Sequence, residues 1–124
     1  MQIIGNLNLL IFKTEFGELQ TSEVVLTDER EIHIKNNHPN DYNFFDKYAT
    51  GIVTNPDLII CGSKNIGTVF MIKRLPDTNL NAVIRLALES DENGLKNSIM
   101  TFYRVRESNV QKLIAKNKII YSRV

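Results

Sequence analysis

The sequence predicts a single α+β domain over residues 1–124, with an N-terminal hairpin and two helices packed on one face of an antiparallel β-meander of about four strands. A C-terminal helix and a short strand complete it. Residues 27–48 show helical spacing, whereas alternating apolar runs bounded by turn residues dominate from Asn55 onward. The length of 124 residues, with 43% hydrophobic and 23% charged residues, suits one domain with a sizeable core.

The first elements are assigned from their start and stop signals. The runs 7–13 and 18–26 are separated by a turn that contains Gly17, so they can pair as a hairpin. A helix over residues 27–37 would begin at a threonine N-cap and stop before Pro39, because the residue before a proline avoids helical geometry.

The later elements follow from apolar periodicity and turn pairs. A helix after Pro39 would bury three aromatic residues at helical spacing. Pro76-Asp77 is a turn pair between two apolar strands, and Gly94 ends the turn before the next strand. The expected elements are a helix over residues 41–48, strands over 56–61, 68–75, 81–88 and 96–105, a helix over 108–116 and a strand over 119–122.

The composition limits the class of protein. The one cysteine, Cys61, cannot form an intramolecular disulfide, and its apolar neighbours indicate a small buried side chain. The first residues lack the basic start of a signal peptide, and no apolar run approaches the ~18 residues of a membrane span. We therefore expect a cytoplasmic protein with no membrane partner.

The net charge of +1 conceals an asymmetry along the chain. Residues 1–46 hold three basic and eight acidic residues, whereas residues 47–124 hold twelve basic and six acidic ones. A polyanionic partner would prefer the second part, because Lys and Arg provide most phosphate binding. The pI of about 7.8 is below the value of about 9 that marks strong nucleic-acid binders, so a solvated basic face is the simpler explanation of the charge pattern alone.

One face of the meander is predicted to carry Lys73, Arg85, Thr101 and Tyr103. Side chains alternate between the two faces of a strand, so the odd-numbered and even-numbered positions of a strand face opposite sides. In each of three strands one of these two sets is apolar, while the other includes hydrogen-bond donors. If these strands are neighbours, the four residues converge on a surface without an acidic group. Such a surface suits a phosphate, although one face of an antiparallel sheet can also be simply solvated.

The two histidines, His33 and His38, lie at or just after the first helix. Five residues of helix turn their side chains ~140° apart, and this segment lacks the spacing that metal ligands need, so we expect no metal site. Arg30 stands one turn before His33 and shares its helix face. Histidine is the natural general acid or base near neutral pH, so His33 is a candidate for proton transfer.

Several short segments follow one another in a specific order. They are T-D-E-R-E-I-H-I at residues 27–34, N-H-P at 37–39, D-Y at 41–42, N-P-D at 55–57, Thr68 with Lys73, Arg85-Leu86, N-S-I-M-T-F at 97–102 and Ile120-Tyr121. Together they resemble the phage-associated branch of the barnase–EndoU–colicin–RelE-like (BECR) nucleases. The likeness runs from about Gly5 to Tyr121, and it departs from the pattern at Asn37, where the branch has arginine.

The resemblance implies a metal-independent ribonuclease that uses no cofactor. In such enzymes a ribose 2′-hydroxyl attacks the adjacent phosphate, and a cyclic phosphate results. His33 would be the general base or acid, and Lys73 and Arg85 would neutralise the phosphorane. Thr101 would hydrogen-bond a non-bridging oxygen, and Tyr103 would do the same or stack on a base.

The resemblance also implies contacts outside the reacting phosphate. Flanking nucleic-acid contacts are expected from Arg30, His38, Lys64 and Arg104. His38 would be either a second catalytic acid or the residue that closes the helix before the proline. The partners would be an RNA substrate and, for a toxin or effector of a mobile element, an immunity or antitoxin protein.

Two other functions fit the sequence. The same fold can bind nucleic acid or protein without cleaving anything, which agrees with the near-neutral pI. Alternatively, the sheet face can be a subunit interface of an assembly protein, because the same parity would place Met71, Val83 and Ile99 on it.

Overall fold

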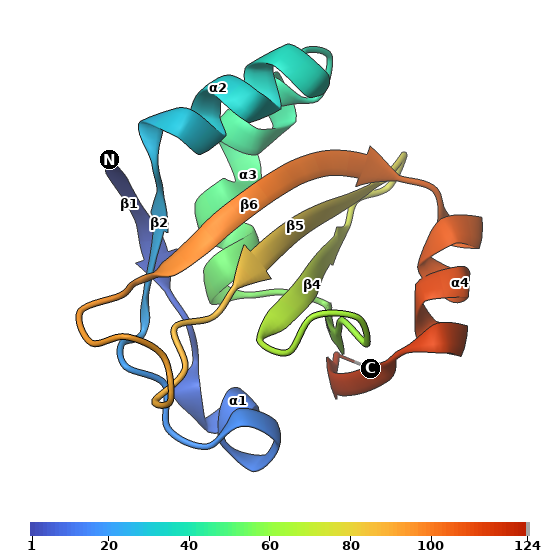
Figure 1. The fold of residues 1–124 in the computed structure, drawn as a ribbon. Helices are drawn as coiled ribbons and strands as arrows, with labels where there is room; N and C mark the ends of the chain where they lie inside the picture. Colours follow the sequence, from blue (N-terminus) through green and yellow to red (C-terminus); the bar gives the residue numbers. More distant parts are fainter. Residues whose placement is uncertain (124) are drawn as a thin grey trace.

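The computed structural model describes residues 1–123 and confirms the α+β class, with four helices and a seven-stranded mixed sheet (Figure 1). Val124, the last residue of the predicted domain, lies outside the described residues. The strands are β1 (Gln2–Asn6), β2 (Glu23–Leu26), β3 (Leu58–Cys61), β4 (Thr68–Arg74), β5 (Asn79–Arg85), β6 (Asn97–Val105) and β7 (Lys118–Ser122). The helices are α1 (Leu9–Phe16), α2 (Asp28–Asn37), α3 (Tyr42–Thr54) and α4 (Glu107–Lys116).

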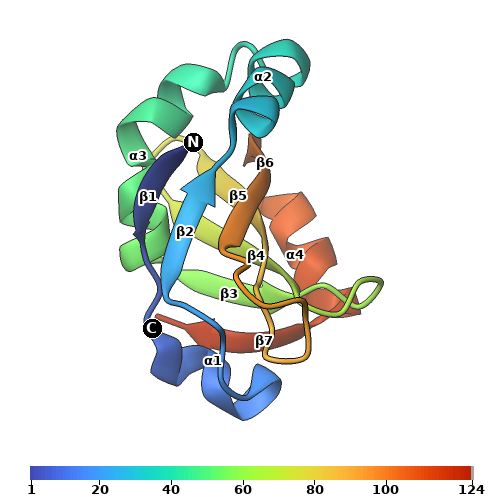
Figure 2. The same cartoon turned by 60° about the vertical axis from the view of Figure 1, so that its left-hand side comes forward.

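The strands lie in the order β1-β2-β6-β5-β4-β3-β7. Strands β3 to β6 form an antiparallel meander, because each pairs with the next in sequence, and β7 extends it beside β3. At the other end β2 runs parallel to β6, with Val24 opposite Asn97 (Figure 2). The sheet is therefore mixed, whereas the sequence predicted only an antiparallel one.

The predicted hairpin around Gly17 is wrong, because the first of its two runs is helix α1. The side chain of Asn8 accepts a hydrogen bond from the Leu10 N–H at 3.2 Å and so caps the start of this helix. Phe12 points into the core, and the helix ends at Gly17, whose φ of 71° is strained for any residue with a side chain. Strand β2 pairs instead with β1, antiparallel.

Helices α2 and α3 form near the predicted positions. The Thr27 hydroxyl accepts a hydrogen bond from the Arg30 N–H at 3.2 Å, as expected of an N-cap, and α2 ends at Asn37. Helix α3 continues six residues beyond the predicted end at residue 48. Its second half continues the apolar stripe and buries Ala49, Ile52 and Val53.

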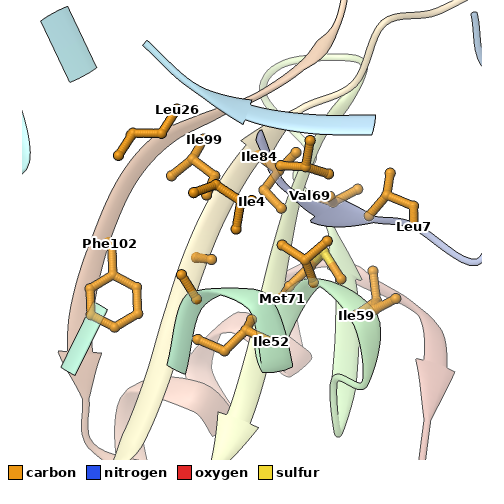
Figure 3. Close-up of a cluster of buried hydrophobic side chains, with 14 of the residues drawn as sticks. Ile4, Leu7, Leu26, Ile52, Ile59, Val69, Met71, Ile84, Ile99 and Phe102 are labelled. Carbon is orange, nitrogen blue, oxygen red and sulfur yellow. The ribbon is translucent and has the colours of Figure 1, made fainter. Parts of the chain in front are cut away.

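The sheet has a helix on each of its two faces. On the face that we call the α3 face, Val69, Met71, Ile84 and Phe102 pack with Ile52 of α3 in the main core (Figure 3). On the opposite face, the α4 face, a smaller cluster forms beneath Val110 of α4 and consists of Leu58, Ile60, Ile72 and Val105. Helix α4 covers only one end of this face, and the remainder is where a site can lie.

The start of α4 is fastened to the sheet by a cluster around Glu107. The Arg74 guanidinium donates to both carboxylate oxygens, at 3.1 and 2.9 Å, and the Asn79 and Gln111 amides add bonds of 3.0 and 2.7 Å. The hydrogen bonds from Arg74, above all, lower the pKa of Glu107 from 4.5 to about 2.

This cluster predicts a pH dependence of stability. Because the folded-state pKa of Glu107 is lowered, the carboxylate stabilises the fold above about pH 4.5, and this contribution is lost as the pH falls toward about 2. The side chain is 49% exposed, so solvent screening limits the effect to about 1 kcal/mol. Urea unfolding at several pH values should show that Glu107→Gln removes this part of the acid destabilisation. Identical pH profiles of the two proteins would contradict the prediction.

Candidate functional site

The register of the meander decides which of the predicted site residues share a face. Val83 lies opposite Phe70 on one side and Thr101 on the other, and opposing residues point to the same face of a sheet. The alternation then puts Arg85 and Tyr103 on that face as well. All of them lie on the α4 face.

Lys73 does not join them, and the predicted convergence of the four residues is wrong in this respect. Lys73 lies opposite Leu80 on the α3 face. Its ammonium group donates to the carbonyl oxygen of Asn55 at 3.0 Å, where α3 ends, and lies 4.0 Å from the Asp57 carboxylate. Apolar residues occupy the odd-numbered positions of β4, next to Lys73, as well as the even-numbered ones, so the sequence does not reveal which set faces which side of the sheet.

The apolar residues that would have formed a subunit interface are also placed differently. Met71 and Ile99 are 1% and 0% exposed and belong to the main core. A bulge between Val83 and Ile84 shifts the register, so that Ile99 faces the core although Thr101 does not. Of the three, only Val83 is half-buried on the α4 face, which removes the argument for an interface.

Arg85 is on the α4 face, but its guanidinium is already occupied. One nitrogen contacts both carboxylate oxygens of Asp91, at 3.2 and 3.3 Å, and the other donates to the carbonyl oxygen of Leu86. Gly67 leaves the space for it, because a Cβ at Gly67 would collide with this second nitrogen. The group is therefore held at the end of β5, two residues along the strand from Val83.

Helix α2 lies beside β6, where β2 has ended, and brings polar groups to this edge (Figure 1). Near the first turn of α2, one Arg30 guanidinium nitrogen lies 3.5 Å from the carbonyl oxygen of Met100 on β6. Just after the last turn of α2, the centroids of the His38 and Tyr103 rings lie 5.3 Å apart. His33 shares the helix face of Arg30 and lies between these two contacts along the chain. We call this group the α2–β6 site, consisting of Arg30, His33, His38, Asn81, Thr101 and Tyr103.

The His33 ring is oriented by a neighbour on the same helix. The Asn37 amide nitrogen lies 2.9 Å from Nδ1 of His33. In this orientation the amide donates to Nδ1, and the neutral ring carries its proton on Nε2. The same amide turned about its last bond would accept from Nδ1–H and leave Nε2 free to take a proton. Asn37 can therefore support proton transfer in either direction.

Tyr103 is held from two sides. The Asn81 amide donates to the phenol oxygen at 3.0 Å, and the His38 ring lies against the Tyr103 ring. Because the phenol oxygen accepts this bond, its own proton stays available for another acceptor. Asp41 is the nearby acid: its carboxylate is 4.0 Å from Nδ1 of His38 and is paired with Arg104.

Two buried polar atoms in the α2–β6 site have no hydrogen-bond partner among residues 1–123. They are the Thr101 hydroxyl and the side-chain carbonyl oxygen of Asn81. Buried polar groups are normally paired, so such atoms mark a place where water or a ligand group is expected. The Thr101 hydroxyl is covered by its neighbours, and a ligand reaches it only when one of them moves.

The remaining predicted nucleic-acid contacts lie apart from this site. Arg104 is on the α3 face, where it pairs with Asp41 and lies over the Phe44 ring, 5.0 Å from its centroid. Lys64 is exposed in the loop between β3 and β4 and has no acidic partner within 4 Å among residues 1–123. It lies near the C-terminal end of α4.

Asn81 and the role of Asn37 are not predicted from the sequence. Asn81 is fully buried in the middle of β5. An amide between two apolar neighbours in a strand is unusual, because it must find hydrogen bonds inside the protein. That signal could have identified it. In the sequence, Asn37 stands out only because it replaces the arginine of the resembled pattern.

Comparison with known proteins gives no relative on which to base an assignment: no family model, curated protein or solved structure matches the chain. Within residues 1–123, no three His, Cys, Asp or Glu side chains are grouped so that they could hold a metal ion. None of the described helices combines the length and the apolar character that a membrane crossing requires.

Proposed function

We propose that the protein is a metal-independent ribonuclease, with the α2–β6 site as its active centre in a BECR-like arrangement. The observation that carries this proposal is the environment of the Arg30 side chain. Arg30 is half-buried, its guanidinium has no acidic partner within 4 Å among residues 1–123, and it contacts the carbonyl oxygen of the residue before Thr101. A cation that contacts the backbone next to a residue with an unpaired hydroxyl suits a phosphate. His33, one helical turn away, adds a group for proton transfer.

In the proposed reaction the ribose 2′-hydroxyl gives its proton to one acid–base group while its oxygen attacks the adjacent phosphorus. The bond from phosphorus to the 5′-oxygen breaks, and this oxygen takes a proton from a second group. The products are a 2′,3′-cyclic phosphate and a 5′-hydroxyl. His33 is one of the two groups, and Tyr103 or His38 is the other.

The other residues stabilise charge on the phosphorane. Arg30 neutralises the non-bridging oxygens, and Thr101 donates a hydrogen bond to one of them once its hydroxyl is uncovered. Arg85, which is held by Asp91, would contact a neighbouring phosphate. Lys73 has no part in the proposal, because it lies on the α3 face.

The first test is the cleavage of a labelled, unstructured RNA by the purified protein in the presence of a chelator. We expect fragments that end in 2′,3′-cyclic phosphates. Arg30→Gln should lower kcat/KM at least about tenfold, because it removes the cation that faces the phosphorane. Arg106→Gln is the matched control, since Arg106 is exposed and precedes α4. Absence of any RNA cleavage, or full activity of Arg30→Gln, would contradict the proposal.

A second candidate function is RNA binding without cleavage. The covered hydroxyl of Thr101 favours it, because a site that must open before it reacts can also remain closed. In that case RNA binds and Arg30→Gln weakens binding, but no cyclic phosphate forms. The family resemblance extends the main proposal to a toxin or effector of a mobile element that acts on RNA in the cytoplasm and is restrained by an immunity or antitoxin protein.

A further inference from the structure

The α4 face continues beyond the α2–β6 site as a groove along helix α4. Two cavities open beside the helix, of about 280 and 330 Å³. Tyr103 lines the first cavity and so connects it to the α2–β6 site, whereas Phe70 lines the second. Leu113 and Lys116 line both cavities, so the groove is continuous along the helix.

All the charged residues that line this groove are lysines. Its cations are Lys64 on the β3–β4 loop and two lysines of α4, Lys112 and Lys116, which lie one turn apart on the same helix face. None of the three has an acidic partner within 4 Å among residues 1–123, and no acidic residue lines either cavity. The other lining groups are neutral.

The groove is also shaped by fixed contacts. The side chain of Asn117 accepts a hydrogen bond from the Ser63 N–H at 2.9 Å and donates to the carbonyl oxygen of Leu113 at 2.9 Å. These bonds tie the β3–β4 loop to the end of α4. As a result, the loop that carries Lys64 is held next to the end of α4, and Lys64 lines the same cavity as Lys116.

We infer that this groove binds the single-stranded RNA that flanks the phosphate in the α2–β6 site. This inference rests on the proposed function. Lysines without acidic partners suit the phosphates of an extended chain, and half-buried aromatic rings suit stacked bases. The first base would stack on Tyr103, and the following nucleotides would run past Lys112 and Lys116 toward Phe70 and Lys64.

The test compares the binding of a 2′-O-methyl octanucleotide and a 2′-O-methyl dinucleotide, neither of which can be cleaved through a 2′-hydroxyl. The native protein should bind the octanucleotide more tightly. The double variant Lys112→Ala/Lys116→Ala should lose about tenfold in octanucleotide affinity, and the slope of log Kd against log salt should fall by about 1.4. Both lysines are exposed, and alanine suits a helix, so the variant should fold.

The matched control is Lys13→Ala/Lys47→Ala, which changes the net charge equally at exposed lysines away from the groove. Its octanucleotide affinity should be unchanged. Equal losses in both double variants, or an equal loss of polyglutamate binding by the groove variant, would overturn the inference in favour of general charge attraction. RNA cleavage without any effect of the groove variant on binding would overturn it while the proposed function stands. Groove-dependent RNA binding without cleavage would support it while the proposed nuclease fails.

Discussion

His33→Ala is expected to lower the rate of RNA cleavage by about 10²–10⁴-fold, the usual contribution of a positioned acid or base. The loss should appear in kcat, because proton transfer occurs in the transition state and substrate binding depends on other groups. It should also remove one limb of the pH–rate profile. Single-turnover cleavage of a labelled RNA between about pH 5 and 9 measures both effects.

The control for this prediction is Asn36→Ala, an exposed residue on the same helix. Both variants should keep the stability of the native protein to within about 0.5 kcal/mol, since both changes are near the surface. If His33→Ala cleaves at the native rate and with the native pH profile, His33 is not in the reaction. The proposed mechanism would then lose its main acid–base group.

Of the substitutions named here, Asn97→Ala is expected to lower the free energy of unfolding most, by about 3 kcal/mol. The fully buried Asn97 amide accepts a hydrogen bond from the Ala87 N–H at 2.8 Å and donates to the carbonyl oxygens of Thr21 and Glu23 at 2.8 and 2.9 Å. The alanine variant would leave a buried N–H and two partly buried carbonyl oxygens without these partners. Urea unfolding should show a lower midpoint with an unchanged slope.

Asn93→Ala provides the matched comparison, because Asn93 is an exposed asparagine in the loop that precedes the same strand. Its free energy of unfolding should change by less than about 0.5 kcal/mol. Asn97→Asp should be destabilising as well, since a carboxylate oxygen would then face the carbonyl oxygens of Thr21 and Glu23. Equal stability of the Asn97 and Asn93 variants would show that the three hydrogen bonds add nothing.

The elements with strong local signals could be predicted from the sequence. Helix α2 has both a threonine N-cap and a proline stop, and the meander strands are separated by good turn residues. Helix α1 could not be predicted in this way, because its short apolar run satisfies a strand pattern as well as a helix pattern. The capping side chain of Asn8 was the available signal.

The residues on each face of the sheet were predicted only in part. The alternation of side chains shows which residues of one strand share a face, but it does not show which residues of the neighbouring strand lie on that same face. Apolar residues occupy both the odd-numbered and the even-numbered positions of β4. The face on which Lys73 lies therefore depends on the pairing of β4 with β5, which cannot be read from the sequence. The bulge before Ile84 likewise moved Ile99 to the core. Within the α2–β6 site, the shared helix face of Arg30 and His33 followed from helical spacing alone.

The contacts that complete the α2–β6 site could not be predicted, since they join distant segments. His38 and Tyr103 are brought together only when α2 docks on β6. The role of the buried Asn81 amide, a hydrogen bond to the Tyr103 hydroxyl, becomes clear only when the pairing of β5 with β6 is known. Local patterns therefore identified candidate residues, whereas the register and the docking of helices decided which of them meet.

The parallel pairing of β2 with β6 also determines when the α2–β6 site can assemble during synthesis. Val24 and Asn97 are far apart in sequence, and such nonlocal pairing is slow to form. The N-terminal segment with α2 leaves the ribosome long before β6, so a nascent or prematurely terminated chain that lacks β6 has no site. Under the proposed function, RNA cleavage would thus begin only after β6 has been synthesised and has paired with β2.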